Sequence, residues 1–187
     1  MSTTTDRSPS QLPNNSNNTP RPTDFHAEIK VPGVGRVSAT QLRIKRLDDR
    51  AILPQYKSTH AAGLDAACLP RHDMPASVTV EPGEIVKIPL GYACAIPFGH
   101  EGQVRPRSGL STKHGISLPN APGTIDADYR GEMFIALINL SKEPYTINHG
   151  DRIAQMIIAP VAHATILEVK ELEDTARGSA GFGSTGI

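Results

Sequence analysis

The sequence NAPGTIDADYRGE, residues 120–132, combines turn residues, a short β-branched stretch and two acids. Its Pro-Gly pair is a turn signal, and the Thr-Ile that follows favours extended backbone. Residues 126–131 favour a tight reversal, and the apolar run at residues 133–138 comes directly after it. We therefore expect a β-hairpin. An acid at the end of its first strand, Asp126, could position a water beside a small planar substrate, although such aspartates often only favour the turn.

Composition limits the class of protein. A chain of 187 residues suits one domain with extensions, and it is long enough to bury a core. With 19 basic and 19 acidic residues, its formal net charge is zero, so we expect no general affinity for nucleic acid or for membrane surfaces. Gly and Pro, at 16 residues each, indicate many turns, as in an all-β domain of short strands.

Cellular location and redox chemistry are inferred from missing signals. No apolar run reaches the roughly 18 residues of a spanning helix, and Met1 is not followed by a hydrophobic signal region, so we expect a cytoplasmic protein without membrane contact. Cys68 and Cys94 lie outside any C-x-x-C pattern and are expected to be buried thiols, with a disulfide as the alternative. The histidines show no metal-binding spacing, so a transition metal held by the protein is not expected.

The chain divides into three parts. Residues 1–25 are rich in Ser, Thr, Asn and Pro and predict a disordered tail, residues 26–170 a β domain, and residues 171–187 a flexible arm. Many short strands separated by turns predict a β-sandwich, a jelly roll or a barrel. The strands are expected at residues 42–47, 77–80, 85–90, 93–96, 102–105, 116–118, 124–125, 132–139, 145–147, 152–160 and 164–169.

One short helix is expected at residues 109–114. Ser108 is a favourable N-cap residue, and Gly115 stands where a left-handed residue would close the helix. Arg105 and Arg107 would flank the helix N-terminus, where free amides and the Ser108 hydroxyl could help to hold a phosphate. The alternative is an ordinary capped helix with solvated arginines.

Three further features allow both a structural and a functional interpretation. Asp65 is an isolated carboxylate among small apolar residues, so it either bonds amides or an arginine, or orders water around a cation. Gln155 lies between apolar neighbours and needs a partner, which could be backbone or a ligand. The terminal GFGSTG, residues 181–186, lacks the Gly-Lys-Ser/Thr ending of a P-loop, but its amides could wrap phosphates, unless it is simply a disordered tail.

Taken in order, five segments resemble the five motifs of the trimeric deoxyuridine triphosphatase (dUTPase) family. The resemblance implies an all-β subunit with a distorted jelly-roll (β-clip) fold and one short helix, in a homotrimer that exchanges its C-terminal arms. It also implies hydrolysis of dUTP to dUMP and pyrophosphate, which keeps uracil out of DNA and supplies dUMP for thymidylate synthesis. The segments are AGLDA (62–66), PRSGL (106–110), GTIDADYRGE (123–132), GDRIAQ (150–155) and RGSAGFGSTG (177–186).

Residue roles on the nucleoside follow from the same resemblance. Asp126 matches the acid that deprotonates the attacking water, and a carboxylate is ionised at neutral pH. Tyr129 would pack on the deoxyribose, and Phe134 is a weaker contact candidate. The uracil edge would be bound by Asn120 and by the backbone of Gly123, Thr124, Ile125 and Asp126.

On the phosphate side, the resemblance implies Mg²⁺ held by the substrate phosphates and by water, with no direct protein ligand. Asp65 would bind water near the metal or brace the site. Arms from another subunit would close over the substrate. The phosphate contacts would come from Arg107, Ser108, Gly109 and Gln155, and the arm contacts from Arg177, Phe182, Gly183 and Ser184.

Two other functions remain as alternatives. A dCTP deaminase has a similar fold but commonly uses a glutamate at the base, whereas this hairpin offers Asp126. A nucleotide-dependent regulatory protein is the other alternative, because the tail at residues 1–25 could fold on binding a partner.

Overall fold

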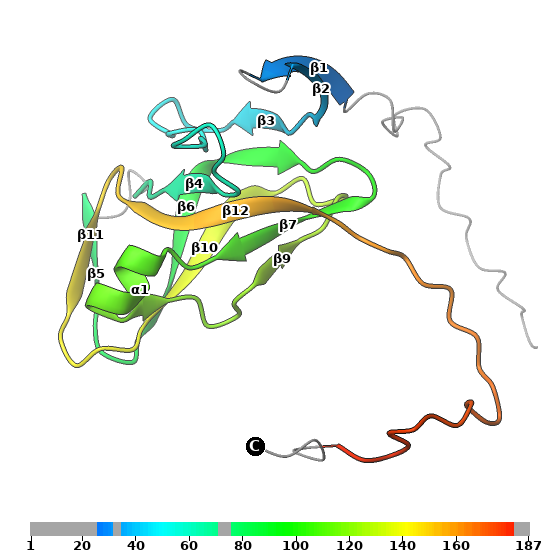
Figure 1. Ribbon diagram of the computed structural model, residues 1–187. Coiled ribbons are helices and arrows are strands. Elements are labelled where there is room, and N and C mark those ends of the chain that lie inside the picture. The colour runs from blue at the N-terminus through cyan, green and yellow to red at the C-terminus, as the bar shows by residue number, and fades with distance from the viewer. Residues whose placement is uncertain (1–25, 32–34, 71–75, 182–187) are drawn as a thin grey trace, which may run out of the picture.

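The computed structural model describes residues 26–31, 35–70 and 76–181 (Figure 1). In these residues the regular secondary structure consists of β-strands and one short helix, as predicted. The elements are β1 (His26–Val31), β2 (Gly35–Thr40), β3 (Arg43–Arg46), β4 (Leu64–Ala67), β5 (Ser77–Val80), β6 (Ile85–Ala95), β7 (His100–Arg105), α1 (Ser108–His114), β8 (Ile116–Ser117), β9 (Gly123–Ile125), β10 (Glu132–Asn139), β11 (Tyr145–Asn148) and β12 (Arg152–Pro160).

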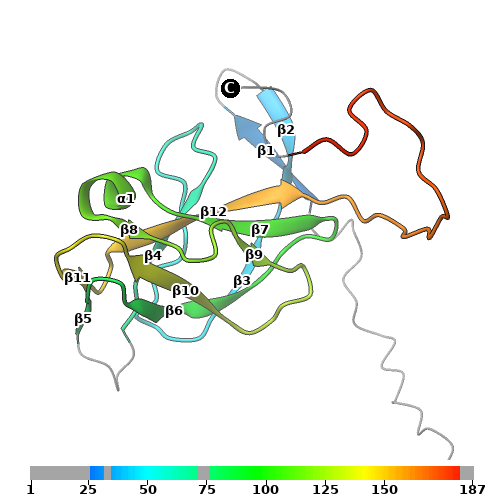
Figure 2. The ribbon, with the colours of Figure 1, turned by 90° about the horizontal axis from the view of Figure 1, so that it is seen from below.

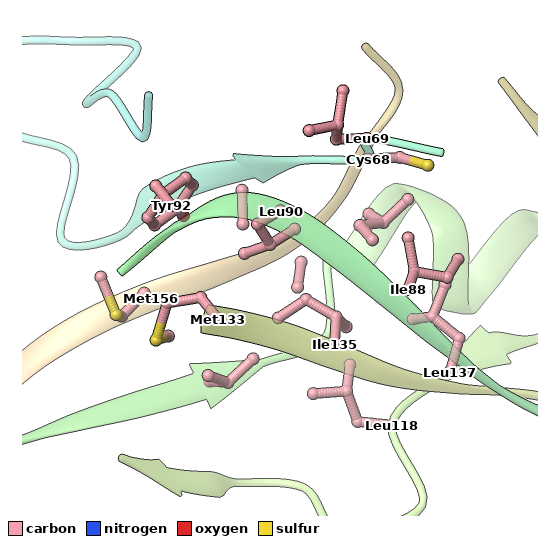
Figure 3. Packing of buried hydrophobic residues seen from close by; sticks show 14 of the residues in the cluster. Cys68, Leu69, Ile88, Leu90, Tyr92, Leu118, Met133, Ile135, Leu137 and Met156 are labelled. Atoms are coloured by element: carbon pink, nitrogen blue, oxygen red, sulfur yellow. The ribbon is translucent and has the colours of Figure 1, made fainter. Parts of the chain in front are cut away.

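Two four-stranded sheets make the body of the molecule, one with the order β3-β6-β10-β8 and the other with the order β4-β12-β7-β9. The ribbon shows them as two layers (Figure 2). Apolar side chains from β6, β10 and β12 form one buried cluster between the layers, as Figure 3 shows for Leu90, Met133 and Met156. This arrangement confirms the expected all-β, jelly-roll-like fold.

The central strand β10 has the period of a strand with one buried face. Met133, Ile135 and Leu137 are at most 2 % exposed, and the residues between them are half-buried. Those intervening residues include Phe134 and Ile138, which are also apolar. The second face of this sheet is therefore apolar as well.

Strand β6 corrects one prediction, because the two strands expected at residues 85–90 and 93–96 form a single strand of 11 residues. Gly91 lies within it with φ +71°. A Cβ at Gly91 would overlap the Leu69 side chain, so a glycine is required here for space as well as for conformation. The register against β10 shifts at this point, so the distortion is absorbed as an irregularity within a continuous strand.

The predicted hairpin is wrong. Strand β9 pairs with β7, through Gly123 opposite Val104, whereas β10 pairs with β6 and β8 in the other sheet. The loop at residues 126–131 therefore carries the chain from one sheet to the other. A turn signal predicts that the chain reverses, but it does not select the strand with which each arm pairs.

Helix α1 confirms its predicted end and corrects its predicted start. Gly115 closes the helix in the left-handed conformation with φ +68°. Ser108, however, is the first helical residue, and the N-cap is Arg107, which makes no side-chain capping bond. The Ser108 carbonyl instead accepts a hydrogen bond from the Thr112 hydroxyl at 2.7 Å.

Other differences from prediction share one cause, which is that a segment forms a strand only where another strand lies beside it. Strand β4, of sequence LDAA, carries no β-branched residue and was not predicted, but it forms because β12 lies beside it. The pair β1 and β2 was also not predicted. The strand expected at residues 164–169 is absent: this segment is irregular, Ile166 is 95 % exposed, and no strand lies beside it in the described chain.

The two cysteines are free and buried, as predicted. Burial raises the pKa of the Cys68 thiol to about 12 and that of Cys94 to about 11. Both thiols are therefore protonated at neutral pH and are poor nucleophiles. The described residues contain no helix with the length and apolar character needed to cross a membrane.

Candidate active site

Three segments distant in sequence meet around the carboxylate of Asp65. Its Oδ1 lies 3.2 Å from Nε of Arg107, and its Oδ2 accepts a hydrogen bond of 2.8 Å from Nη1 of Arg152. Arg107 also donates to the Arg152 carbonyl at 2.8 Å. Because the Asp65 side chain is only 13 % exposed, water screens these pairs less than it screens pairs on an open surface. Asp65 therefore fixes Arg107 in place, which is the structural role considered for it.

Gln155 lies opposite Asp65 in the ladder between β12 and β4. Its amide donates a hydrogen bond of 3.0 Å to the Pro106 carbonyl, so the partner it needs is backbone. A Cβ at Gly63 would lie 2.5 Å from the Gln155 Oε1, so glycine leaves the space that this amide occupies. The contact joins β12 to the segment that enters α1.

The entry to α1 presents donors to solvent. Ser108 and Gly109 are exposed, and the first amides of a helix have no acceptor within the helix. Arg107 stands directly before them, whereas the Arg105 guanidinium bonds the Gln103 side chain at 2.5 Å. Arg107, Ser108 and Gly109 are thus suited to bind an anion, and Arg105 is engaged elsewhere.

At the opposite edge of the same sheet, β9 leads into the acidic loop. Asn120 is exposed ahead of it, and a Cβ at Gly123 would lie 3.2 Å from the Asn120 Nδ2. Glycine therefore allows the Asn120 amide to lie close against the backbone of β9. Thr124 is exposed and Ile125 is half-buried.

Asp126 borders a cleft of about 410 Å³. Among the described residues its carboxylate has no hydrogen-bond or ion-pair partner, although its backbone carbonyl accepts from the Tyr129 amide at 3.1 Å. The carboxylate can therefore accept a proton or orient a water without breaking an existing bond. The cleft is lined by Phe98, Gly99, His100, Glu101, Thr124, Asp126, Ala127, Asp128, Val161 and His163.

The loop after Asp126 holds an exposed aromatic ring in one position. The Tyr129 hydroxyl donates to the Glu132 carbonyl at 2.8 Å, and the residue is 41 % exposed. A Cβ at Gly131 would overlap the Tyr129 ring, so glycine is needed for the ring to fold back over the turn. Arg130 donates to the carbonyls of Ala127 and Tyr129 at 2.7 and 2.8 Å and closes the loop.

The two groups of candidate residues are far apart within one chain. Asp65 lies on β4, Asp126 follows β9, and β12 and β7 lie between them, which makes three strand spacings or about 14 Å. Asp65 pairs with Gln155, which in turn pairs with Arg105 on β7. Extending the β9 register by one residue brings Asp126 opposite Glu101 on the same strand. Arg105 and Glu101 are four residues apart, so the two groups are also displaced by about 13 Å along the strand direction. One chain alone therefore does not bring the two groups together.

The remaining predicted site residues lie outside both groups. Phe134 is on β10, in the other sheet, with the Lys87 ammonium 4.1 Å from its ring centre. Arg177 is exposed in a turn of the arm, where its Nε donates to the Ala180 carbonyl at 2.9 Å. The other arm residues, Phe182, Gly183 and Ser184, lie outside the described residues.

Within the described ranges, no group of three or more His, Cys, Asp or Glu side chains could hold a metal ion. Both oxygens of Asp65 already contact guanidinium groups, which leaves this carboxylate poorly suited to a metal. A divalent cation bound mainly by a ligand's own oxygens is the arrangement that these residues fit.

Arg152 is the site residue that the sequence interpretation missed, because its segment was regarded as strand core. A signal was available, since a mostly buried acid needs a cationic or amide partner and Arg152 is a candidate cation. The histidines of the Asp126 cleft, His100 and His163, come from the start of β7 and from beyond β12, and no sequence pattern connects them.

Fold and site together define a jelly-roll-like β protein with a candidate anion-binding helix entry and a carboxylate beside a cleft. The dUTPase family model matches residues 49–186, and the chain belongs to the dUTPase family. It is 59 % identical over 136 residues to the deoxyuridine 5'-triphosphate nucleotidohydrolase of Desulfotalea psychrophila, covering 72 % of this chain and 87 % of the relative. The enzyme of the same name from Syntrophotalea carbinolica is 52 % identical over 146 residues, covering 78 % and 97 %.

Solved structures agree with this assignment. A mutant dUTPase of Staphylococcus bacteriophage 80alpha with dUpNHpp superposes with a TM-score of 0.71 at 28 % identity, covering 80 % of this chain and all of that one. A mutant dUTPase from phage phi11 of S. aureus, described with a structural Mg(II) ion, has a TM-score of 0.64 at 27 % identity and covers 72 % of this chain and all of the other.

Proposed function

We propose that this protein hydrolyses dUTP to dUMP and pyrophosphate by attack of water on the α-phosphorus, with Asp126 as the general base. Membership of the dUTPase family supports the reaction. The observation that carries the mechanism is the Asp126 carboxylate, which borders a cleft and has no partner among the described residues. An ionised carboxylate in that position accepts the proton of a bound water as the water attacks.

Recognition of the nucleoside is assigned to the segment before and after Asp126. The Asn120 amide and the backbone of Gly123, Thr124 and Ile125 offer fixed donors and acceptors for the uracil edge, which rejects cytosine because its pattern is reversed. Tyr129 packs on the deoxyribose, since its ring is exposed and held by the bond to the Glu132 carbonyl. Phe134 is a secondary contact at most, because the Lys87 ammonium already lies over its ring.

Recognition of the triphosphate is assigned to the other group. Arg107, Ser108 and Gly109 bind phosphate oxygens at the entry to α1, and Gln155 keeps this entry in position through the Pro106 carbonyl. Asp65 acts through Arg107 and is a positioning residue. Mg²⁺, when bound to the phosphates, would neutralise part of their negative charge.

The two groups form complete sites only if chains assemble, and we assign them to a homotrimer. The half-buried apolar residues on the second face of β10 and the 58 % exposed Ile85 are suited to subunit contact. Arg177, Phe182, Gly183 and Ser184 of an exchanged arm would then close over the substrate and exclude water. Light scattering on the purified chain gives the subunit number directly.

The reaction is tested by offering dUTP, dCTP, dTTP and UTP separately to the purified chain with Mg²⁺ and assaying pyrophosphate and ammonia. Pyrophosphate from dUTP alone is expected, and EDTA should suppress it. Ammonia from dCTP would establish a deaminase instead. No product from any nucleotide would favour a regulatory binding protein.

The shared site is tested by mixing two inactive variants. Trimers of Asp126→Asn chains and trimers of Arg107→Gln chains should each be nearly inactive. After denaturation and refolding together, mixed trimers contain sites that draw Asp126 from one chain and Arg107 from another, so activity should return. Mixtures that stay as inactive as the separate variants would place both residues of a site in the same chain.

A further inference from the structure

Three polar side chains form a continuous hydrogen-bonded row along β7. They occupy every second position of the strand and lie on the outer face of its sheet, because Gly102 and Val104 between them are buried. The Arg105 Nη2 donates to the Gln103 Oε1 at 2.5 Å, and the Gln103 Nε2 donates to the Glu101 Oε1 at 2.8 Å. Gln103 therefore uses both the oxygen and the nitrogen of its amide, and it links a cation at one end of the row to a carboxylate at the other.

The acidic end of this row lies beside Asp126. Glu101 lines the same cleft, and because Gly102 is opposite Ile125, the next pair in the register sets Glu101 opposite Asp126. Residues in such positions have Cβ atoms about 5 Å apart, and like charges there repel one another. The third acid of the cleft, Asp128, lies further along the loop, beyond the end of β9. The Glu101 carboxylate is therefore the one that the strand pairing brings up against Asp126.

The row gives these two acids different surroundings. Glu101 is half-buried, and one of its oxygens accepts the hydrogen bond from Gln103. The Arg105 guanidinium, bound to the oxygen of the same amide, polarises it and strengthens its N–H as a donor. The negative charge of Glu101 is thus partly compensated along β7, whereas the Asp126 carboxylate has no partner among the described residues.

We propose that Gln103 is a positioning residue for the hydrolysis of dUTP: it holds the Glu101 carboxylate along β7 and so leaves Asp126 as the acid that orients the attacking water. The proposal rests on the proposed function, because it concerns the cleft in which Asp126 acts. Gln103 itself does not line this cleft and acts through Glu101. Without the two hydrogen bonds, the Glu101 carboxylate could turn into the cleft, where it would repel Asp126 and the substrate phosphates and compete for the water.

The test is the steady-state kinetics of dUTP hydrolysis by Gln103→Met, which keeps the length of the side chain and removes both hydrogen bonds. The kcat should fall roughly three- to tenfold, as expected for a partly screened repulsion between like charges. Adding Glu101→Gln removes the charge that is released, so the double variant should return to within about twofold of wild type. The matched control is Gln55→Met, because Gln55 accepts from the Lys57 ammonium at 3.2 Å and does not line the cleft; its kcat should be that of wild type.

A second variant, Arg105→Met, removes only the cation at the end of the row. Its kcat should fall less than that of Gln103→Met and should also recover when Glu101→Gln is added. Thermal unfolding verifies that the variants are folded. A wild-type kcat in Gln103→Met, or a loss of equal size in the double variant, would overturn the inference while leaving the proposed function intact. A wild-type chain that does not hydrolyse dUTP would reject the proposed function and this inference with it.

Discussion

Asp65 and Asp126 are the same residue type at opposite edges of one sheet, and their surroundings differ completely. Asp65 is mostly buried, and both of its oxygens contact arginines. Asp126 is exposed beside a cleft, and among the described residues its carboxylate has no partner. A carboxylate with two cationic partners contributes to structure, whereas one without partners remains available for chemistry. The environment therefore distinguishes the two roles.

The sharpest test of this contrast, with the largest expected effect, is Asp126→Asn. Turnover of dUTP should fall by roughly 10²- to 10⁴-fold, because an amide cannot take the proton of the attacking water. The melting temperature should hardly change, since the carboxylate has no described partner to lose. Steady-state kinetics and calorimetry measure the two quantities.

Glu101→Gln is the matched control, because Glu101 lines the same cleft and bonds the Gln103 side chain at 2.8 Å. Its turnover should stay within about threefold of wild type, as expected for a side chain outside the chemical step. Asp126→Asn with near-normal turnover would remove Asp126 from the mechanism.

Asp65→Asn should show the reverse profile. It leaves Arg107 and Arg152 without their shared counter-charge and should cost about 1–3 kcal/mol of stability, or several degrees in melting temperature. Turnover should fall less than in Asp126→Asn, with a raised KM for dUTP because Arg107 is no longer fixed. Unchanged melting temperature and KM would contradict the bracing role.

A smaller effect is expected from Gly63→Ala, which perturbs the edge of the sheet that carries Asp65 without altering a charge. The new Cβ would lie 2.5 Å from the Gln155 Oε1 and would displace the amide from the Pro106 carbonyl. One lost hydrogen bond corresponds to about 1 kcal/mol, so KM should rise roughly fivefold. The substitution should add nothing in a Gln155→Ala background, and an additive effect there would indicate another cause.

The smallest effect is expected from Tyr129→Phe, in the loop that follows Asp126. It keeps the ring and removes only the hydrogen bond to the Glu132 carbonyl. Because the loop is exposed, turnover should fall about two- to threefold and the melting temperature should change by less than about 2 °C. A loss comparable to that of Asp126→Asn would show that the hydroxyl itself has a role in the reaction.

Local patterns predicted much of the fold. The apolar run at residues 133–138 identified the strand β10, and Gly115 identified the end of α1. Prediction failed where a distant partner decided the outcome. Strand β4 forms beside β12 despite a composition without β-branched residues, while residues 164–169, with a suitable composition, have no strand beside them in the described chain.

The candidate site divides in the same way. The sequence singled out Asp65, Arg107, Asp126 and Gln155, because acids, arginines and amides in these settings carry recognisable chemistry. It did not reveal that Arg152 shares the Asp65 carboxylate. It also placed Asp126 in a hairpin that does not form.

The sequence by itself determined the all-β class, the short helix that ends at Gly115 and the side chains available for chemistry, because these depend on composition, on short-range periodicity and on turn residues. Only the tertiary structure decided which strands pair, which carboxylate is neutralised and how far apart the two groups lie. The physical reason is that strand pairing and ion pairing join residues distant in sequence, and each partner is selected by the packing of the whole chain.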